Sequence, residues 1–502
     1  MTRIEPSFDE FAALAKHASV VPVSRELLAD TLTPVSAFAA VGEGPGSYLL
    51  ESVVGGEKWA RYSFVGFEPE LIVRAVGDRF EEQRADGLRV RMVSDPWQAL
   101  REIMQGYRPP PVPWLPRFWG GAVGFVSYDA VRAFEPTVQG QHKAQAAVEP
   151  QFAFSIAGTV LIFDNLRHTI RVVVAARIDD HEDLQDTYKA AVARIERAQQ
   201  RLREPLRLRT LPAPVRDRRD QSLEIPPSSF DRPGFCAAVE TCKEHIRAGD
   251  IFQVVLSQRF RTSSAGLDPY DVYRALRVIN PSPYMYFLRF AQLRIAGASP
   301  EVMVRLENGR AEVRPIAGTR PRGRDDAEDT RIQAELFADP KELAEHVMLV
   351  DLGRNDLGRI STPGSVRVTE RMVCERYSHV MHITSNVQGQ LSAGKDAVDV
   401  LRATFPAGTL SGAPKVRAMQ IIEALEPETR GVYGGAIGYL SFEGNMDMAI
   451  SIRTVVEQAG ELFVQAGAGI VEASQPEAEY EETINKAKAV LAAIATAREA
   501  QG

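Results

Sequence analysis

Short segments with a β-type pattern of apolar residues dominate the chain as far as about residue 195. They are YLLESVV (48–54), RYSFVGF (61–67), ELIVRAV (70–76), GAVGFVSYD (121–129), FAFSIAGTVLIFD (152–164) and TIRVVVAARI (169–178). Turn residues separate them at short spacing, which favours antiparallel pairing over alternating βαβ units. A helix is predicted over 182–202. The next stretch, 203–229, loses the apolar period and collects prolines, which indicates a linker.

Helical and extended patterns are mixed in the second part of the chain. Its first helix has an apolar face that starts at Phe235, and Gly249 is a candidate C-cap. A strand is predicted over 251–260, where alternation places Gln253 on the face opposite Phe252. Further strands are predicted at 286–297, 302–306, 311–315, 379–388, 434–443, 447–455 and 461–466, and helices at 266–278, 326–352, 396–404, 414–425 and 476–498. Strands clustered between helices, with hairpin signals, predict an α+β layered architecture. The chain is therefore divided into an N-terminal region (1–202), the linker (203–229) and a second region (230–502).

Composition narrows the class of ligand and the compartment. The 502 residues include 59 Lys and Arg against 66 Asp and Glu, a formal net charge of −7. This balance provides no basic field for nucleic acid or an anionic membrane, so a small metabolite is the expected ligand. The three cysteines lack metal-type spacing, which indicates a reducing compartment. Acidic residues interrupt the N-terminal segment where a signal peptide needs an apolar core, and no apolar run approaches the ~18 residues of a membrane span. The expected location is the cytoplasm.

Two pairs of glutamates at helical spacing are candidates for metal binding. In DPKELAEHVMLVDLGRND, Glu342 and Glu345 project from neighbouring points of a helix that follows the Asp-Pro break, about 5–6 Å apart at Cβ. Glu479 and Glu482 form the second pair, in EAEYEETINKAKAV. Two acidic helix faces repel each other unless a cation lies between them, and hard oxygen ligands suit magnesium. Either pair alone is more often a solvated helix face.

Two glycine-rich segments resemble nucleotide-binding loops and fail at decisive positions. GQLSAGKD (389–396) spaces its glycines and Lys395 as a phosphate loop does. Asp396, however, stands where a Ser or Thr hydroxyl would reach the metal, so a turn that opens a helix is predicted instead. GEGPG (42–46) lacks the third glycine of a dinucleotide fingerprint and is interpreted as a loop.

Candidate acid and base groups are Glu301 and His382. His379 and His382 are spaced like metal ligands, but YSHVMHITSNV has a strand pattern, in which positions three apart point to opposite faces. A single strand histidine is usually structural, yet its near-neutral pKa also suits acid–base chemistry. The residues alone leave both interpretations open.

Two turns share the sequence Ala-Gly-Thr and carry flanking cations, RPIAGTRPRG and FPAGTLSGAPKVRAMQ. In the second, Pro414 near a helix start leaves free backbone amides beside Thr409, and such a terminus can hold a carboxylate. In QAGAGIV, Gly467 and Gly469 allow close approach of a ligand or form a bulged strand. With Arg453 on a predicted strand, these features predict a site for a small anion with more than one carboxylate, handled with magnesium.

Taken together, the segments resemble the large subunit, component I, of anthranilate synthase in the family of chorismate-utilising enzymes. The similarity covers nearly the whole chain and rests on YLLES (48–52), RYSF (61–64), GDIFQVVLSQRF (249–260), NPSPYMYFL (280–288), GASPE (297–301), RPIAGTRPRG, KELAEHVMLVDLGRNDLGRIS (341–361), the His382 segment, FPAGTLSGAPK, IRT (452–454), GAGIV (467–471) and EYEETINKA (479–487). It implies an α+β fold made of a two-layer antiparallel β sandwich flanked by helices, with the site between the layers. It also implies conversion of chorismate and ammonia to anthranilate and pyruvate, the first committed step of tryptophan biosynthesis.

The resemblance further implies how magnesium would be held. Glu345 and Glu482 would be its principal ligands, and Glu342 and Glu479 would support them through water. This division is physically reasonable, because magnesium keeps several waters and takes few carboxylates. The ion would bind the ring carboxylate of chorismate.

Roles for the other site residues follow from the same resemblance. Glu301 would protonate the departing 4-hydroxyl while ammonia adds at C2, His382 would assist the later elimination of pyruvate, and Thr409 would hold the ring carboxylate. The remaining substrate contacts are expected from Thr319, Tyr433, Arg453, Gly467, Gly469 and Lys486.

Two positions distinguish members of the family. Relatives that add water carry a lysine in place of Gln253, and a neutral amide cannot serve as that base. Relatives that make aminodeoxychorismate have a lysine nucleophile where this chain has Ala317, so here ammonia must attack carbon directly. Both residues favour anthranilate. The alternatives are an aminodeoxychorismate synthase component I and a non-catalytic tryptophan-binding relative.

The resemblance also implies regulation and a partner. Five residues are expected to line a pocket for tryptophan as feedback inhibitor, namely Glu51, Ser52, Pro283, Met285 and Tyr286. The chain contains no cysteine in a glycine-flanked nucleophile turn, so ammonia is expected from a separate glutamine amidotransferase subunit, in a heterotetramer with two copies of each chain.

Overall fold

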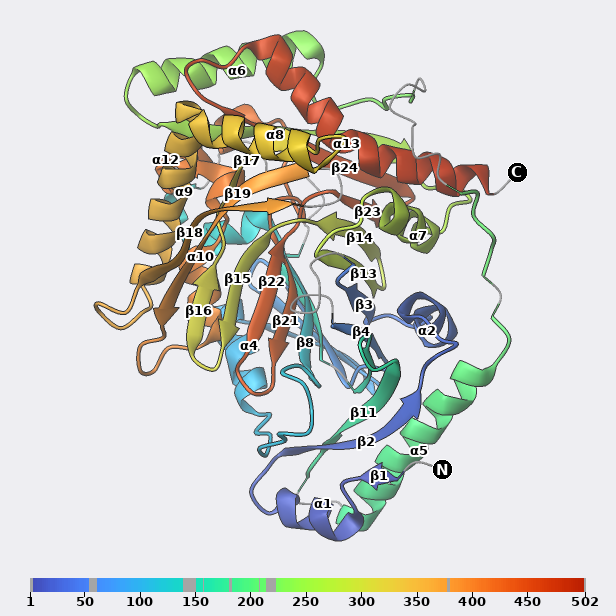
Figure 1. Ribbon diagram of the computed structural model, residues 1–502. Coiled ribbons are helices and arrows are strands. Elements are labelled where there is room, and N and C mark those ends of the chain that lie inside the picture. Colours follow the sequence, from blue (N-terminus) through green and yellow to red (C-terminus); the bar gives the residue numbers. More distant parts are fainter. Residues whose placement is uncertain are drawn as a thin grey trace.

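Two large antiparallel β-sheets, with helices on their outer faces, make up the structure (Figure 1). It is a computed structural model that describes residues 3–53, 61–138, 150–156, 158–179, 183–206, 208–213, 223–376 and 380–500. Every strand pairing is antiparallel, as the short turn-separated segments predict. The α+β class and the two-sheet architecture are therefore confirmed.

The first sheet contains β1 (Ile4–Glu5), β2 (Val20–Leu28), β3 (Ser47–Glu51), β4 (Tyr62–Phe67), β10 (Thr159–Asp164), β11 (Thr169–Arg177), β12 (Gln253–Ser263), β13 (Tyr284–Phe290), β14 (Leu293–Ser299), β20 (Gly412–Ala413), β23 (Thr454–Gln458) and β24 (Glu461–Ile470). Its order is β1-β2-β11-β10-β4-β3-β13-β14-β23-β24-β12-β20. Strands from both sides of the 203–229 segment thus meet in one sheet, at the β3–β13 pair.

The second sheet contains β5 (Leu71–Val76), β6 (Arg79–Arg84), β7 (Gly87–Met92), β8 (Gly121–Val126), β9 (Phe152–Ile156), β15 (Val302–Glu307), β16 (Arg310–Val313), β17 (Ile316–Pro321), β18 (Arg367–Arg376), β19 (Val380–Gln390), β21 (Ala436–Ser441) and β22 (Met446–Ile450). Its order is β17-β19-β16-β15-β22-β21-β8-β9-β5-β6-β7, and β18 also pairs with β19. Here too the two parts of the chain meet, at the β8–β21 pair. The division of the chain into two regions joined by a linker at 203–229 stays a prediction.

The helices are α1 (Phe8–Ala15), α2 (Pro34–Val41), α4 (Pro96–Gln105), α5 (Leu184–Arg203), α6 (Arg232–Arg247), α7 (Pro269–Ile279), α8 (Asp326–Ala338), α9 (Pro340–Gly358), α10 (Ala397–Thr404), α11 (Gly408–Ser411), α12 (Lys415–Leu425) and α13 (Pro476–Glu499), with 3-10 turns at Tyr128–Ala133 and Pro136–Val138. Three of them, α4, α7 and α9, start at an Asp-Pro pair. The aspartate caps free amides and the proline has the φ of a first helical residue, so the sequence itself specifies these starts.

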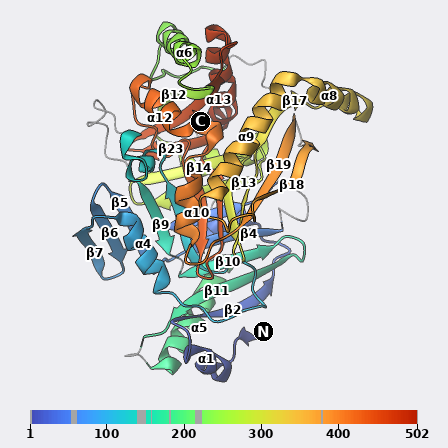
Figure 2. The ribbon, with the colours of Figure 1, turned by 90° about the vertical axis from the view of Figure 1, so that its left-hand side faces the viewer.

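The core between the sheets is apolar and aromatic. Phe125 of β8 meets Phe290 of β13 across the layers in an edge-to-face contact, with ring centroids 5.8 Å apart. A second apolar cluster lies on the outer face of the first sheet beneath α1, α2, α5, α7 and α13. On the second sheet, α9 packs against β17 and β19 (Figure 2). Within the described residues, no helix is long and apolar enough to cross a membrane.

Several predicted elements are divided in the structure. The segments 152–164, 286–297 and 447–455, each predicted as one strand, are the pairs β9/β10, β13/β14 and β22/β23. The strands on both sides of each connection are largely buried, so apolar residues continue through the segment, and the connections are too short for a turn signal to separate the two strands. The helix predicted over 326–352 is α8 and α9, with Asp339 as the N-cap of α9.

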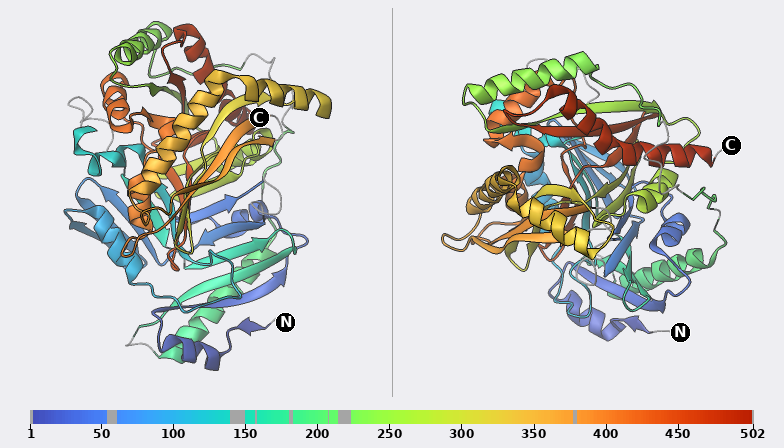
Figure 3. Two further views of the ribbon diagram at one scale, coloured as in Figure 1. Left: turned by 60° about the vertical axis from the view of Figure 1, so that its left-hand side comes forward. Right: turned by 45° about the horizontal axis from the view of Figure 1, so that its top comes forward.

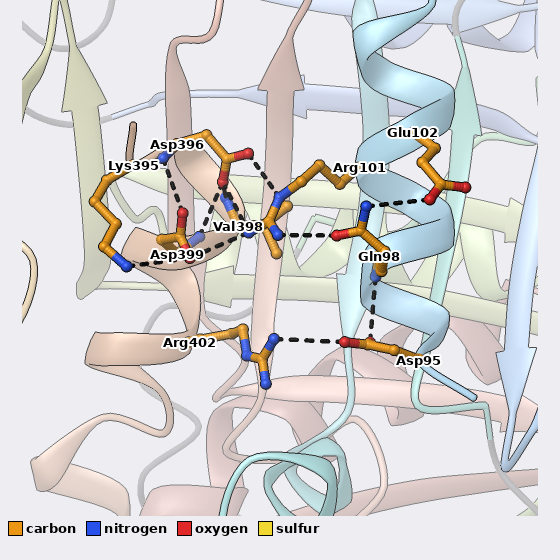
Figure 4. A network of polar contacts seen from close by, with 9 residues as sticks. All are labelled: Asp95, Gln98, Arg101, Glu102, Lys395, Asp396, Val398, Asp399 and Arg402. Carbon is orange, nitrogen blue, oxygen red and sulfur yellow. Dashed lines mark hydrogen bonds and ion pairs between the residues drawn. The ribbon is translucent and has the colours of Figure 1, made fainter. Parts of the chain in front are cut away.

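The phosphate-loop-like segment opens a helix, as predicted. Asp396 caps α10 by accepting hydrogen bonds from the amides of Val398 (3.0 Å) and Asp399 (3.1 Å). Arg101 of α4 pairs with Asp396 at 2.8 Å and with Asp399 at 3.1 Å (Figure 4). Both carboxylates are used within the protein, which confirms that this turn is structural.

Candidate active site

Glu301 directly precedes β15, in the connection from β14 of the first sheet to β15 of the second. Thr409 contacts it from α11. The Thr409 hydroxyl donates a hydrogen bond to Glu301 Oε1 at 3.0 Å. Burial raises the pKa of the Glu301 carboxyl to about 7, although Thr409 and the charges of Arg453 and Lys486 lower it. A carboxyl that exchanges its proton near neutral pH suits general acid catalysis. The structure therefore brings together two residues that the sequence selected independently.

His382 faces the first Ala-Gly-Thr turn. In the pairing of β17 with β19, Thr319 lies opposite His382, and the imidazole Nδ1 is 3.0 Å from Thr319 Oγ1 and 3.2 Å from the carbonyl oxygen of Gly318. Burial lowers the pKa of His382, and the charge of Arg453 lowers it further. The hydrogen bond with Gly318 raises the pKa, but the net lowering favours the neutral ring, which can accept a proton. His379 lies outside the described residues.

Arg453 is close enough to affect both candidate acid–base groups, but it is not on a strand as predicted. It lies in the turn between β22 and β23 with a φ of 50°, in the left-handed region that an arginine seldom adopts. Its Nη1 donates to Asn280 Oδ1 at 3.2 Å, at the end of α7. The turn places this half-buried cation close enough to Glu301 for the two charges to interact.

Gly467 and Gly469 of β24 make room for other side chains. A Cβ on Gly467 would lie 2.9 Å from the hydroxyl oxygen of Tyr433, and a Cβ on Gly469 would lie 2.7 Å from Gln253 Nε2. Both approaches are closer than real Cβ contacts allow. Lys486 of α13 donates to the carbonyl oxygen of Gly467 at 3.0 Å. The two glycines thus permit Tyr433, Gln253 and Lys486 to converge on one segment of β24.

The acid pairs lie in the first two turns of α9 and α13, helices that reach the same end of the molecule (gold and dark red in the left view of Figure 3). Burial raises the pKa of Glu345, a hydrogen bond from Gln253 lowers it, and the neighbouring Glu342 raises it. Burial also raises the pKa of Glu479, and Lys486 and Lys341 lower the pKa of both Glu345 and Glu479. Since Lys341 is on α9 and Lys486 on α13, the two helix starts share one electrostatic environment.

Only two of the four glutamates have cationic partners. Arg320 pairs with Glu342 at 2.9 Å and Lys486 pairs with Glu482 at 2.7 Å. Across the described ranges, Glu345 and Glu479 have no such ion pair, and no group of three or more His, Cys, Asp or Glu side chains could hold a metal ion by itself. The donors are oxygen atoms of the kind that magnesium takes, but they do not close around a single point.

The two family-discriminating positions both adjoin the acid pairs. Gln253 Nε2 donates to Glu345 Oε1 at 3.3 Å, and Gln253 is the first residue of β12. Ala317 is buried on β17, and the next residue, Gly318, has a φ of 63°. A Cβ on Gly318 would lie 3.2 Å from Glu342 Oε2. The side chains at these two positions are therefore an amide and a methyl group, and neither position supplies an amine that could act as a base or nucleophile.

The predicted tryptophan-binding residues lie along the β3–β13 pair. Glu51 is opposite Met285, and its carboxylate accepts hydrogen bonds from Tyr273 (2.5 Å) and Arg277 (3.2 and 3.3 Å) of α7. Ser52 and Pro283 are at the adjoining ends of the two strands. The Tyr286 side chain points to the other face, where its hydroxyl is 2.6 Å from Thr454 Oγ1. Glu51 and Met285 thus share the α7 face, and Tyr286 belongs to the core between the sheets.

Sequence reasoning did not select three residues that contact this region, Asn280, Glu426 and Arg430. Asn280 holds Arg453, and Arg430 holds the backbone of α11 next to Thr409. The only signal for Glu426 and Arg430 in the sequence is their spacing of four residues after the predicted helix 414–425. Oppositely charged residues at this spacing usually form a solvated pair on the surface.

Comparison with known proteins identifies the family. Residues 52–492 match the family model described as chorismate binding enzyme. The chain is 48% identical over 500 residues to anthranilate synthase component 1 of Aquifex aeolicus, covering 99% of both chains, and 48% identical to that of Pseudomonas aeruginosa, covering 98% and 99%.

Solved structures agree with this assignment. The crystal structure of anthranilate synthase component I from Streptococcus pneumoniae superposes with a TM-score of 0.74 at 38% identity, covering 93% of this chain and 99% of that one. The isochorismate synthase MenF from Escherichia coli has a TM-score of 0.68 at 20% identity, covering 97% and 98%, and shares the fold. The chain therefore belongs to the chorismate-binding enzyme family and, within it, to the anthranilate synthase component I group.

Proposed function

We propose that the chain is the large subunit of an anthranilate synthase, which converts chorismate and ammonia to anthranilate, pyruvate and water. The observation that carries this proposal is the carboxyl of Glu301, whose pKa burial raises to about 7 and which accepts a hydrogen bond from the hydroxyl of Thr409. Loss of the 4-hydroxyl of chorismate requires a proton donor, and the raised pKa lets Glu301 keep its proton closer to neutral pH than an ordinary glutamate does.

The neighbouring residues then have complementary roles. Glu301 donates its proton to the 4-hydroxyl, which leaves as water while ammonia forms the new bond at C2. His382, neutral because its pKa is lowered by burial, accepts the C2 proton as the enolpyruvyl ether bond breaks and pyruvate leaves. Arg453, Tyr433 and Lys486 would bind the enolpyruvyl carboxylate beside Gly467.

Magnesium is proposed as the cofactor, held by the two acid pairs. The raised pKa values of Glu345 and Glu479 support this, because a cation between α9 and α13 would relieve the repulsion within each pair. Direct ligation by Glu345 and Glu482, with Glu342 and Glu479 acting through water, agrees with an open donor set. When bound, the ion would supply positive charge to the ring carboxylate.

The choice of nucleophile rests on Gln253 and Ala317. Water addition and covalent attack by lysine each need an amine at one of these positions, and this chain has an amide and a methyl group there. We propose that ammonia comes from a glutamine amidotransferase subunit in a cytoplasmic heterotetramer, and that tryptophan inhibits by binding at Glu51, Ser52, Pro283 and Met285. Tyr286 would act in that inhibition from the other face of the sheet.

Product analysis tests the proposal. The purified chain is incubated with chorismate, ammonium and Mg²⁺, and anthranilate is followed by its fluorescence. We expect anthranilate without the partner subunit, and none when Mg²⁺ is removed by a chelator. Isochorismate or 4-amino-4-deoxychorismate as product would contradict the proposal. Tryptophan binding without turnover would identify a non-catalytic sensor.

A further inference from the structure

A buried ion pair, Glu426 with Arg430, adjoins the segment that carries Thr409. Glu426 is the C-cap of α12, and Arg430 follows four residues later. Arg430 Nη2 is 2.6 Å from Glu426 Oε1, and Nε donates to Oε2 at 2.9 Å. The two residues are only 2% and 3% exposed. Removal of two charges from water costs several kcal/mol per ion, so such a pair persists only where other groups complete its hydrogen bonds.

Those further hydrogen bonds go to the elements that carry the site. Arg430 Nη1 donates to the carbonyl oxygen of Leu410 at 2.6 Å, in the residue after Thr409. Arg430 Nη2 donates to the carbonyl oxygen of Val255 at 2.7 Å, on the strand that begins at Gln253. One guanidinium therefore connects α11 to β12.

Glu426 extends the connection to β24. Its Oε1 accepts hydrogen bonds from both the amide and the hydroxyl of Ser257, each at 2.8 Å. Ser257 is paired with Gly467 across the β12–β24 ladder. Glu426 thus fixes Ser257, and the pairing of β12 with β24 fixes Gly467 opposite it. The Gly467 carbonyl oxygen is the one that Lys486 contacts.

Two aromatic rings contact the same cation. The guanidinium carbon of Arg430 is 4.5 Å from the ring centroid of Tyr128 and 5.7 Å from that of Tyr433. The backbone amide of Tyr433 also donates to the carbonyl oxygen of Arg430 at 3.3 Å. Cation–π attraction is stronger in a desolvated setting, so these contacts restrict the orientation of both rings.

We propose that the Arg430–Glu426 pair is a positioning unit for the reaction, which holds the α11 turn so that Thr409 points at Glu301 and holds β12, β24 and Tyr433 in register around the substrate. The inference rests on the proposed function. Arginine suits this role because its planar fork reaches two carbonyls and a carboxylate at once, whereas the single nitrogen of lysine cannot span them.

The substitution Arg430→Lys tests the proposal, because it keeps the charge opposite Glu426 and removes the fork. Misplacement of a reacting group by about 1 Å can cost ~100-fold in rate, so we expect kcat/KM for chorismate to fall by about 10- to 100-fold. Arg305→Lys is the matched control. The Arg305 side chain is 11% exposed and pairs with Asp447 at 2.9 Å, between β15 and β22 and not at α11, β12 or β24, so its variant should keep the kcat/KM of the unmodified protein. If Arg430→Lys fails to fold, the double variant Arg430→Gln/Glu426→Gln replaces the ion pair by neutral amides.

A double-mutant cycle with Thr409→Val separates positioning from general stability. If the pair acts through Thr409, Arg430→Lys will move the basic limb of the pH profile in the unmodified protein and will have no such effect in the Thr409→Val background. Additive effects, or a variant with less folded protein but unchanged kcat/KM and pH profile, would overturn the proposal. The same four proteins are also compared in their affinity for chorismate, measured by calorimetry without ammonia. This comparison tests the positioning role even if the product of the reaction is not anthranilate.

Discussion

The protonation state of Glu301 should set the upper limit of the pH range in which the enzyme works. Burial raises the pKa of this carboxyl from 4.5 to about 7, which corresponds to about 3 kcal/mol at 1.36 kcal/mol per pKa unit. A general acid must carry its proton, so activity is retained below this pKa and lost above it. We expect log kcat/KM to fall with a slope of about −1 above a midpoint near pH 7.

Thr409→Val removes the hydrogen bond that favours the ionised form of Glu301. A hydrogen bond to a charged acceptor contributes about 1.5–3 kcal/mol, so its loss should raise the midpoint of the limb by about one to two pH units. Glu301→Gln cannot donate a proton at any pH and should lower kcat by about 10²- to 10⁴-fold, with no basic limb. Thr496→Val is the matched control, since that buried hydroxyl donates to the backbone of its own helix.

The assay follows anthranilate fluorescence from pH 5.5 to 9 (about one and a half to two pH units on each side of the expected midpoint). Mg²⁺ is kept saturating and the concentration of uncharged ammonia is held constant across the buffers, so that neither cofactor binding nor nucleophile supply produces a limb. The reasoning would be refuted by a profile without a basic limb, or by a Thr409→Val limb that stays in place or moves to lower pH.

Three other changes have expected outcomes. Gln253→Ala removes the hydrogen bond to the Glu345 carboxylate, so the Mg²⁺ concentration for half-maximal activity should change by about tenfold, with anthranilate still the only product; an unchanged metal titration would contradict the role of the amide. Glu51→Ala should abolish tryptophan inhibition at near-normal turnover and, because hydrogen bonds from α7 are lost, lower the free energy of unfolding by about 1–3 kcal/mol in denaturant titration; retained inhibition would show that the pocket lies elsewhere. Gly467→Ala places a methyl group 2.9 Å from the Tyr433 hydroxyl and should raise the KM for chorismate about tenfold or more, whereas Gly44→Ala, which meets nothing within 4 Å, should leave it unchanged; equal kinetics for both would contradict the packing argument.

The elements that the sequence predicted are those whose signals are local. The helix predicted over 266–278 is α7, which starts at an Asp-Pro pair, and Asp396 caps α10 as the failed phosphate-loop pattern indicates. The helix α4 was not predicted, although it also starts at an Asp-Pro pair. The charged strands β6, β7 and β18 were not predicted. β7 and β18 are largely exposed and β6 buries only one residue fully, so no apolar alternation identifies these strands, and pairing with a neighbouring strand makes them extended.

The sequence by itself determined the chemical groups of this protein: two acid pairs at helical spacing, a candidate acid at Glu301, an amide at Gln253 and a methyl group at Ala317. The tertiary structure alone decided how these groups act. Thr409 meets Glu301 across 108 residues of chain, and Gln253 meets Glu345 across 92. Local spacing cannot specify such contacts or the burial that raises the pKa of Glu301, because both arise only when two sheets and their helices exclude water from a shared interior.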